Sequence, residues 1–274
     1  MGVSANKAPA AVQRWIPAWW AVFLIGLVLW LATIGVASLT GDLIILPTIV
    51  LLGSFLVPVT AVVWYLDHDS SPELAPRRIV SAFLIAGVLG VLGASVLEYY
   101  LISVGLLGNL EVGLIEEFVK AVLIVLTAWG IRSFHLRDGM VLGATVGFGF
   151  AALESSGYAL ASLFVVYQHR LVLSLDSVVV TELIRGILAP FGHGAWSAIV
   201  GGAMFAAARA RGRIGLSRGI IGAFVLVVLL HAVFDSVSRI DGYVVIAVVG
   251  TVPLVLMWRR GRREDLASPS SYFR

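Results

Sequence analysis

Three ionisable side chains lie within five residues of one apolar stretch, GLIEEFVKAVLIVLTAWG (113–130). They are Glu116, Glu117 and Lys120. An acid or a lysine at the centre of a membrane-spanning helix costs about 2.5–3.5 kcal/mol on insertion scales, so such residues are rare there and usually functional. Glu116 and Lys120 are four residues apart and share one helix face. Glu117 lies about 100° further round the helix, so the two carboxylates can do different work.

Further ionisable residues fall within later apolar stretches. They are Glu154, Arg185, His193, His231 and Asp235. His231 and Asp235 are four residues apart, so this carboxylate can orient the imidazole on its own helix face. Consecutive spans run in opposite directions, yet most of these groups fall at a similar depth, in the outer half of the bilayer. We therefore expect one site in a water-filled cavity that opens outward.

The residue types favour hydrolysis by an activated water molecule. A carboxylate shielded from bulk water can act as the general base on water. A neutral histidine can donate to a developing oxyanion or bind a metal ion. No serine or threonine stands out as a nucleophile at helical spacing from a histidine. The chain has no cysteine, which excludes thiol catalysis, disulfides and Cys-ligated metals.

The composition indicates which elements must position these residues. Of the 274 residues, 59% are hydrophobic and 13% charged, whereas a soluble domain has about 25% charged residues. This predicts an all-α, polytopic helix bundle in the cell membrane, with the lipid bilayer as its surroundings and no nucleic-acid partner. About eight stretches can cross a bilayer as helices of roughly 20 residues. We place these spans at 15–39, 43–66, 79–102, 107–131, 139–167, 183–208, 219–238 and 242–258.

The charges in the loops predict the orientation. Of the 19 lysines and arginines, only Arg170 and Arg239 fall in outer loops and only Lys120 and Arg185 in spans, if the N-terminus is inside. The positive-inside rule then places both termini in the cytoplasm. The predicted parts are a cytoplasmic segment (1–14), a transmembrane domain (15–258, with a catalytic core at about 75–240) and a basic cytoplasmic tail (259–274). The long fifth span is expected to tilt or break near ESSGYAL (154–160).

Structural interpretations of the same residues compete with the functional one. Glu116 and Lys120 could form an ion pair that locks two helices, and His231 and Asp235 a buried hydrogen-bonded pair. Arg185 lies near the outer interface, where it is expected to snorkel. Glu98, beside two tyrosines, is interpreted mainly as part of an interfacial belt. The convergence of the polar groups at one depth favours a function.

Four short motifs occur in order on consecutive spans. They are EEFVK (116–120), FAALE (150–154), HGAW (193–196) and HAVFD (231–235). Together they resemble the PrsW family of intramembrane proteases, which is related to the CAAX prenyl endopeptidases and the bacterial CAAX-like proteases. The resemblance covers about residues 75–240. It implies an endopeptidase that cleaves a membrane-anchored protein on its outer side, an anti-sigma factor in the best-known members.

The resemblance also implies roles for the matching residues. Glu116 would be the general base, and Glu117 would support it. Glu154 takes the place of a histidine of the CAAX proteases, and His193 matches the other histidine of the family. The candidate catalytic residues are Glu116, Glu117, Glu154, His193, His231 and Asp235, supported by Lys120 and Arg185.

Three questions stay open at this point. Zn²⁺ held by Glu154, His193, His231 and Asp235 is an alternative to water activated by glutamate alone, although the zinc signature H-E-x-x-H is absent. A proton-coupled secondary transporter would use buried acids and histidines equally well, but no internal repeat is visible and the polar groups lie off-centre. A non-catalytic membrane scaffold is the third possibility, and the full set of candidate residues argues against it.

Overall fold

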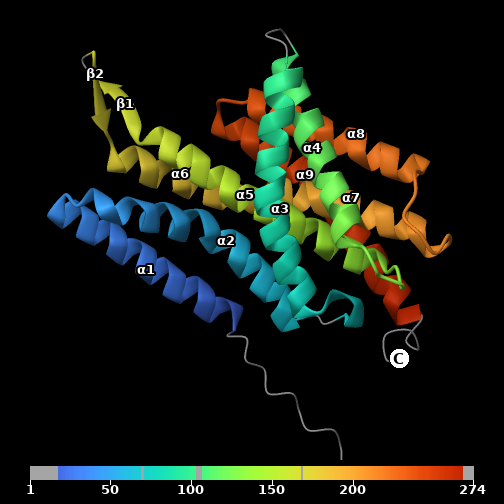
Figure 1. Ribbon diagram of the computed structural model, residues 1–274. Helices are drawn as coiled ribbons and strands as arrows, with labels where there is room; N and C mark the ends of the chain where they lie inside the picture. The colour runs from blue at the N-terminus through green and yellow to red at the C-terminus, as the bar shows by residue number, and fades with distance from the viewer. Residues whose placement is uncertain (1–17, 69–70, 103–106, 168, 268–274) are drawn as a thin grey trace, which may run out of the picture.

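Helices make up most of the structure, which is a computed structural model that describes residues 18–68, 71–102, 107–167 and 169–267 (Figure 1). One antiparallel hairpin, β1 (Phe164–Tyr167) and β2 (Arg170–Leu173), pairs Phe164 with Leu173 at its base. The helices are α1 (Trp19–Thr40), α2 (Leu46–His68), α3 (Pro76–Leu101), α4 (Gly108–Thr127), α5 (Leu136–Ser162), α6 (Leu175–Leu188), α7 (His193–Arg209), α8 (Arg218–Ser236) and α9 (Ile240–Ala267). Short 3₁₀ turns occur at Leu43–Ile45, Pro72–Leu74 and Ala189–Phe191.

The predicted all-α membrane bundle is confirmed. Six helical segments within the described residues are long and apolar enough to cross a membrane: Trp19–Thr40, Leu43–His68, Pro76–Leu101, Leu136–Ser162, Arg218–Ser236 and Ile240–Leu266. The chain is therefore a multi-pass integral membrane protein. Helix α4 carries the charged residues of the opening motif, and α6 and α7 are shorter, with 14 and 17 residues. The number of eight spans and the cytoplasmic placement of both termini stay predictions.

Helix α5 is the central helix of the bundle. In the most apolar 18-residue stretch of α5, 83% of the residues are buried, whereas in the corresponding stretches of the peripheral helices α1 and α9 only 11% are buried. Figure 1 shows α3 and α4 crossing α5, with α1 and α2 paired along one side. Small residues let the backbones approach closely. A Cβ at Gly143 would overlap the carbonyl of Ser197, and a Cβ at Gly147 would overlap the carbonyl of His193.

Replacing Gly147 with alanine should therefore push α7 away from α5 and displace His193. Inserting a methyl group into such a tight contact costs about 1–3 kcal/mol. We expect Gly147→Ala to lower the thermal unfolding midpoint. Gly157→Ala in the same helix is the matched control, because nothing lies within 4 Å of its added Cβ. The control should be neutral or slightly stabilising, and equal effects of both variants would contradict the close approach.

The predicted span 183–208 is not one continuous helix. Helix α6 ends at Leu188, a 3₁₀ turn follows, and α7 begins at His193. Pro190 has no amide hydrogen, and Gly192 adopts φ −102° and ψ −120°, outside the helical region. This break places His193 at the N-terminus of α7.

The fifth predicted span also differs from the structure. It ends at Ser162, and the residues up to 167 belong to the hairpin instead. The expected break near ESSGYAL is absent from this described stretch, because α5 is continuous there. The Ser156 hydroxyl donates to the carbonyl of Ala152 at 2.9 Å, which is compatible with an unbroken helix.

The last helix is longer than predicted. Helix α9 continues to Ala267, so the first part of the predicted tail (259–274) is helical. Ion pairs stabilise this extension: Glu264 accepts from Arg260 at 2.9 Å and from Arg209 at 2.6 Å, and Asp265 accepts from Arg137 at 3.1 Å. The predicted N-terminal segment (1–14) and residues 268–274 lie outside the described residues.

Candidate active site

The polar residues singled out from the sequence gather where α4, α5, α7 and α8 meet, with one more side chain from α6. The group consists of Glu116, Glu117, Lys120, Glu154, Arg185, His193, His231 and Asp235. The two imidazole rings lie 5.1 Å apart between centroids. The structure therefore brings together all eight residues from five helices.

Lys120 lies at the centre of this group and is 1% exposed. Its Nζ is 2.6 Å from Glu117 Oε1, 3.3 Å from Glu116 Oε2 and 2.8 Å from His193 Nδ1. An ammonium has three hydrogens and no acceptor, so these three atoms accept from it. The same ammonium lies 4.5 Å from the centroid of the Phe150 ring. The cation thus offsets the burial of two adjacent carboxylates.

The contacts of His193 assign its tautomer. Because Nδ1 accepts from Lys120, the hydrogen of the neutral ring is on Nε2, which donates to Glu154 Oε2 at 3.0 Å. Arg185 Nη2 donates to the same Glu154 oxygen at 2.5 Å. A chain of contacts thus links the guanidinium through the carboxylate to the ring.

The sequence suggested that Arg185 snorkels at the interface, but in the structure its guanidinium contacts residues of α5. Besides its ion pair with Glu154, its Nε donates to Ser155 Oγ at 2.8 Å. Its guanidinium also lies 4.2 Å from the ring centroid of Tyr158. The sequence could not show this, because α6 and α5 meet only in the folded bundle.

His231 is held between carboxylates on both sides. Its Nδ1 donates to Glu117 Oε1 at 2.9 Å, and its Nε2 lies 3.3 Å from Asp235 Oδ2 and 3.6 Å from Glu116 Oε2. The ring is 1% exposed. The Asp235 side chain is 33% exposed, so the group reaches the protein surface on this side.

A small cavity of about 100 Å³ adjoins the group. It is lined in part by Ser155, Arg185, His193, Phe234 and Tyr243. A cavity needs roughly 10–15 Å³ of such volume to hold one water molecule, together with polar partners. Water can therefore reach the imidazole of His193 and the guanidinium of Arg185.

The donor atoms also fit a divalent metal ion, which would replace Lys120 as the partner of His193 Nδ1. One ligand atom each of Glu116, His193 and His231 lie within 4.8 Å of one another. Two histidines and a glutamate are a known ligand set of catalytic zinc. The other ring nitrogen of each histidine contacts a carboxylate, Glu154 or Glu117, as is usual for ligating histidines. The set predicted from the sequence contained Glu154 and Asp235 instead of Glu116, because it took Glu116 as the base.

Trp196 and Glu98 were not assigned to the site from the sequence. Trp196 is fully buried, one turn after His193, and its ring lies 5.0 Å from His231 and 5.6 Å from His193 between centroids. Tryptophan is common in membrane proteins, so its type gave no signal. Glu98 was assigned to an interfacial belt, yet its Oε1 atom is buried and has no hydrogen-bond partner within the described residues. Only the exposed neighbours Tyr99 and Tyr100 fit the belt.

Arg185→Gln should lower the catalytic rate by about 10–100-fold, the usual effect of losing a group that orients a functional side chain. The variant removes the partner of Glu154 and so loosens the contact of this carboxylate with His193. We expect the rate constant to fall more than the affinity for substrate, in a cleavage assay with purified protein. Arg170→Gln on the exposed hairpin removes the same charge and should leave the rate unchanged. If Arg185→Gln and Arg170→Gln lowered the catalytic rate equally, the cause would be the loss of a positive charge in general and not the contact with Glu154.

Comparisons with known proteins agree with this site. A family model described as "PrsW family intramembrane metalloprotease" matches residues 16–258, which include all eight residues of the group. "Protease PrsW" of Geobacillus kaustophilus (strain HTA426) is 28% identical over 193 residues, covering 68% of this chain and 78% of that protein. No solved structure gives a significant match.

Proposed function

This chain belongs to the PrsW family of intramembrane metalloproteases and is a membrane peptidase, and we propose that it cleaves a membrane-anchored protein by activating water at Glu116. One observation carries this proposal. Glu116 Oε2 lies 3.3 Å from Lys120 Nζ, 3.6 Å from His231 Nε2 and 3.9 Å from His193 Nδ1. A single carboxylate oxygen thus lies within 4 Å of the Lys120 ammonium and of both imidazole rings. Membership of a protease family favours this reading over the transporter.

In the proposed reaction, Glu116 accepts a proton from water as the water oxygen bonds to the carbonyl carbon of the substrate. The carbonyl becomes an oxyanion, to which a protonated His231 donates from Nε2. Glu116 then gives its proton to the amide nitrogen as the C–N bond breaks. The products are a carboxylate and an amine.

The remaining residues orient these groups. Glu117 and Asp235 hold the imidazole of His231, and Glu154 holds that of His193. A divalent ion bound by Glu116, His193 and His231 would polarise the carbonyl and promote ionisation of a bound water. The ligand histidines would then be neutral. Lys120 Nζ lies 3.3 Å from Glu116 Oε2 and 2.6 Å from Glu117 Oε1, so its charge favours the ionised forms of both carboxyl groups.

We further propose that cleavage occurs near the outer side of the membrane. The distribution of lysine and arginine supports cytoplasmic termini and eight spans. Glu116 is eight residues from the start of α4, or about 12 Å at the rise of an α-helix. With this orientation the start of α4 is its outer end, and the group lies in the outer half of the bilayer. A membrane-anchored anti-sigma factor is the substrate class that the family resemblance supports.

The proposal is tested by a cleavage assay on a panel of membrane-anchored anti-sigma factors, with metal analysis of the same purified protein. We expect cleavage of at least one substrate on its outer side. Stoichiometric Zn²⁺ and inhibition by a chelator would support a metal-assisted reaction, for which Glu116, His193 and His231 are the candidate ligands. Cleavage by metal-free protein would leave Glu116 as an unaided base. Metal binding without cleavage of any membrane-anchored protein would contradict the proposal.

A further inference from the structure

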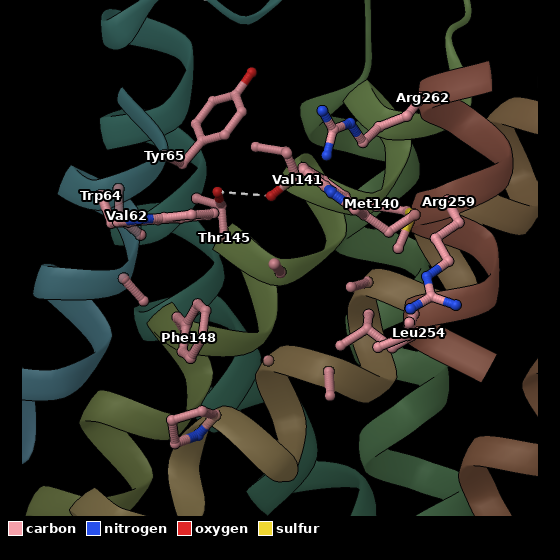
Figure 2. Close-up of a pocket in the computed structure, with 18 residues that line it drawn as sticks. Val62, Trp64, Tyr65, Met140, Val141, Thr145, Phe148, Leu254, Arg259 and Arg262 are labelled. Atoms are coloured by element: carbon pink, nitrogen blue, oxygen red, sulfur yellow. Dashed lines mark hydrogen bonds between the residues drawn. The ribbon is translucent and has the colours of Figure 1, made fainter. Parts of the chain in front are cut away.

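A second cavity, of about 480 Å³, lies between α2, α5, α7 and α9 (Figure 2). It contains none of the eight residues of the candidate active site. Its volume is within the range of roughly 300–1,000 Å³ that small-molecule sites occupy. The walls are mainly apolar, with Val62, Met140, Phe148 and Leu254 among the residues that line it.

The cavity opens to the side of the bundle, toward the bilayer. Trp64 and Val255 line it and are 43% and 38% exposed. Both belong to segments that can cross a membrane, so the exposed surface faces lipid chains. An apolar ligand from the bilayer can therefore enter without crossing water.

The α9 side of this cavity is basic. Arg259 and Arg262, three residues apart on α9, both line it. Figure 2 shows the Arg262 side chain extending from α9 on the side of Tyr65, whereas the Arg259 guanidinium turns toward Leu254. Neither arginine has an ion-pair partner within the described part of the chain. By contrast, the acidic residues nearby are already occupied: Glu264 pairs with Arg260 and Arg209, and Asp265 pairs with Arg137.

We propose that this cavity binds an anionic phospholipid, with an acyl chain between α2, α5 and α9 and the phosphate at Arg259 and Arg262. Basic pockets between transmembrane helices bind anionic head groups, and guanidinium groups bind phosphate through paired hydrogen bonds. The distance along α9 from Leu254 to Arg262 is about 12 Å, so the two arginines follow the apolar residue Leu254 along the helix. Trp64, Tyr65 and Trp258 also line the cavity, and such aromatic residues are typical of membrane interfaces.

The test uses the purified full-length protein and two lipids of equal chain length, phosphatidylglycerol and phosphatidylcholine. Native mass spectrometry during lipid titration measures the retained lipid. We expect the wild type to retain phosphatidylglycerol preferentially. Arg259→Gln with Arg262→Gln should weaken this retention by at least about tenfold. Arg263→Gln is the matched control, because Arg263 is exposed, lies beside Arg262 and does not line the cavity.

A variant in the apolar part of the cavity tests the position of the acyl chain. Ala144→Phe should fill part of the cavity and also weaken retention, and Ala61→Leu tests the α2 wall if Ala144→Phe does not fold. Equal retention of both lipids would overturn the proposal. It would also be overturned if the Arg263 control lost as much lipid as the double variant, or if the filled cavity bound lipid normally. A photo-crosslinker at position 144 that captured a protein segment instead of lipid in native membranes would assign the cavity to a different partner.

Discussion

Glu116→Gln is expected to abolish peptide-bond cleavage while the protein remains folded. Glutamine has nearly the same shape, and its amide oxygen can still accept from Lys120, 3.3 Å away in the wild type. It cannot accept a proton from water, and a lost general base typically costs 10²–10⁴-fold in rate. An amide is also a weaker ligand for a divalent ion than a carboxylate. The measurement is the rate of substrate cleavage by purified protein in detergent or vesicles.

The control for this variant is Asp176→Asn, which makes the same carboxylate-to-amide change in the exposed first turn of α6. Its cleavage rate should equal that of the wild type. The thermal unfolding midpoints of both variants should show that each is folded. Cleavage at the wild-type rate by Glu116→Gln would remove Glu116 from the reaction, whatever the metal content.

Contacts within one helix could be predicted from the sequence, because helical spacing fixes which residues share a face. The pairing of Glu116 with Lys120 and that of His231 with Asp235 are both present in the structure, at 3.3 Å each. The all-α membrane class followed from composition alone. A chain with few charges and long apolar runs must bury those runs in lipid.

Contacts between helices could not be predicted in this way, because they depend on how each helix is rotated and tilted in the bundle. Lys120 on α4 contacts His193 on α7, which helical spacing within α4 could not indicate. Likewise, nothing in the spacing indicated that Arg185 would pair with Glu154. These partners are set by close packing of glycine-lined backbones, such as α5 against α7.

The break between α6 and α7 shows a second limit of sequence reasoning. Proline and glycine are tolerated inside membrane helices, so Pro190 and Gly192 did not by themselves indicate an interruption. The hairpin at 164–173 was missed because a short apolar run is compatible with either a strand or the end of a helix. Both features help to position the site: the break places His193 at the start of α7, and the hairpin connects α5, which carries Glu154, with α6, which carries Arg185.

Lys120→Met should destabilise the protein by about 3–5 kcal/mol, the usual cost of removing one partner from a buried ion pair, and should also abolish cleavage. Methionine keeps the length of the side chain but leaves Glu116 and Glu117 without their cation. Their side chains are 8% and 1% exposed, so water cannot solvate the two carboxylates once the cation is gone. Unfolding of the purified protein by denaturant, followed by circular dichroism, measures the loss.

A double variant, Glu117→Gln with Lys120→Met, measures how much the Lys120–Glu117 ion pair contributes to stability. If the loss of stability arises from an uncompensated buried carboxylate, the double variant should recover part of it, and the coupling energy should be favourable in the wild type. Cleavage should not return, because Glu116 and His193 still lack their shared donor. The exposed cation Arg132 gives the matched control, since Arg132→Met should change stability by less than about 0.5 kcal/mol. A Lys120→Met protein as stable as this control would show that the ammonium does not hold the four-helix junction together, and the two glutamates would then have to be buried in another way.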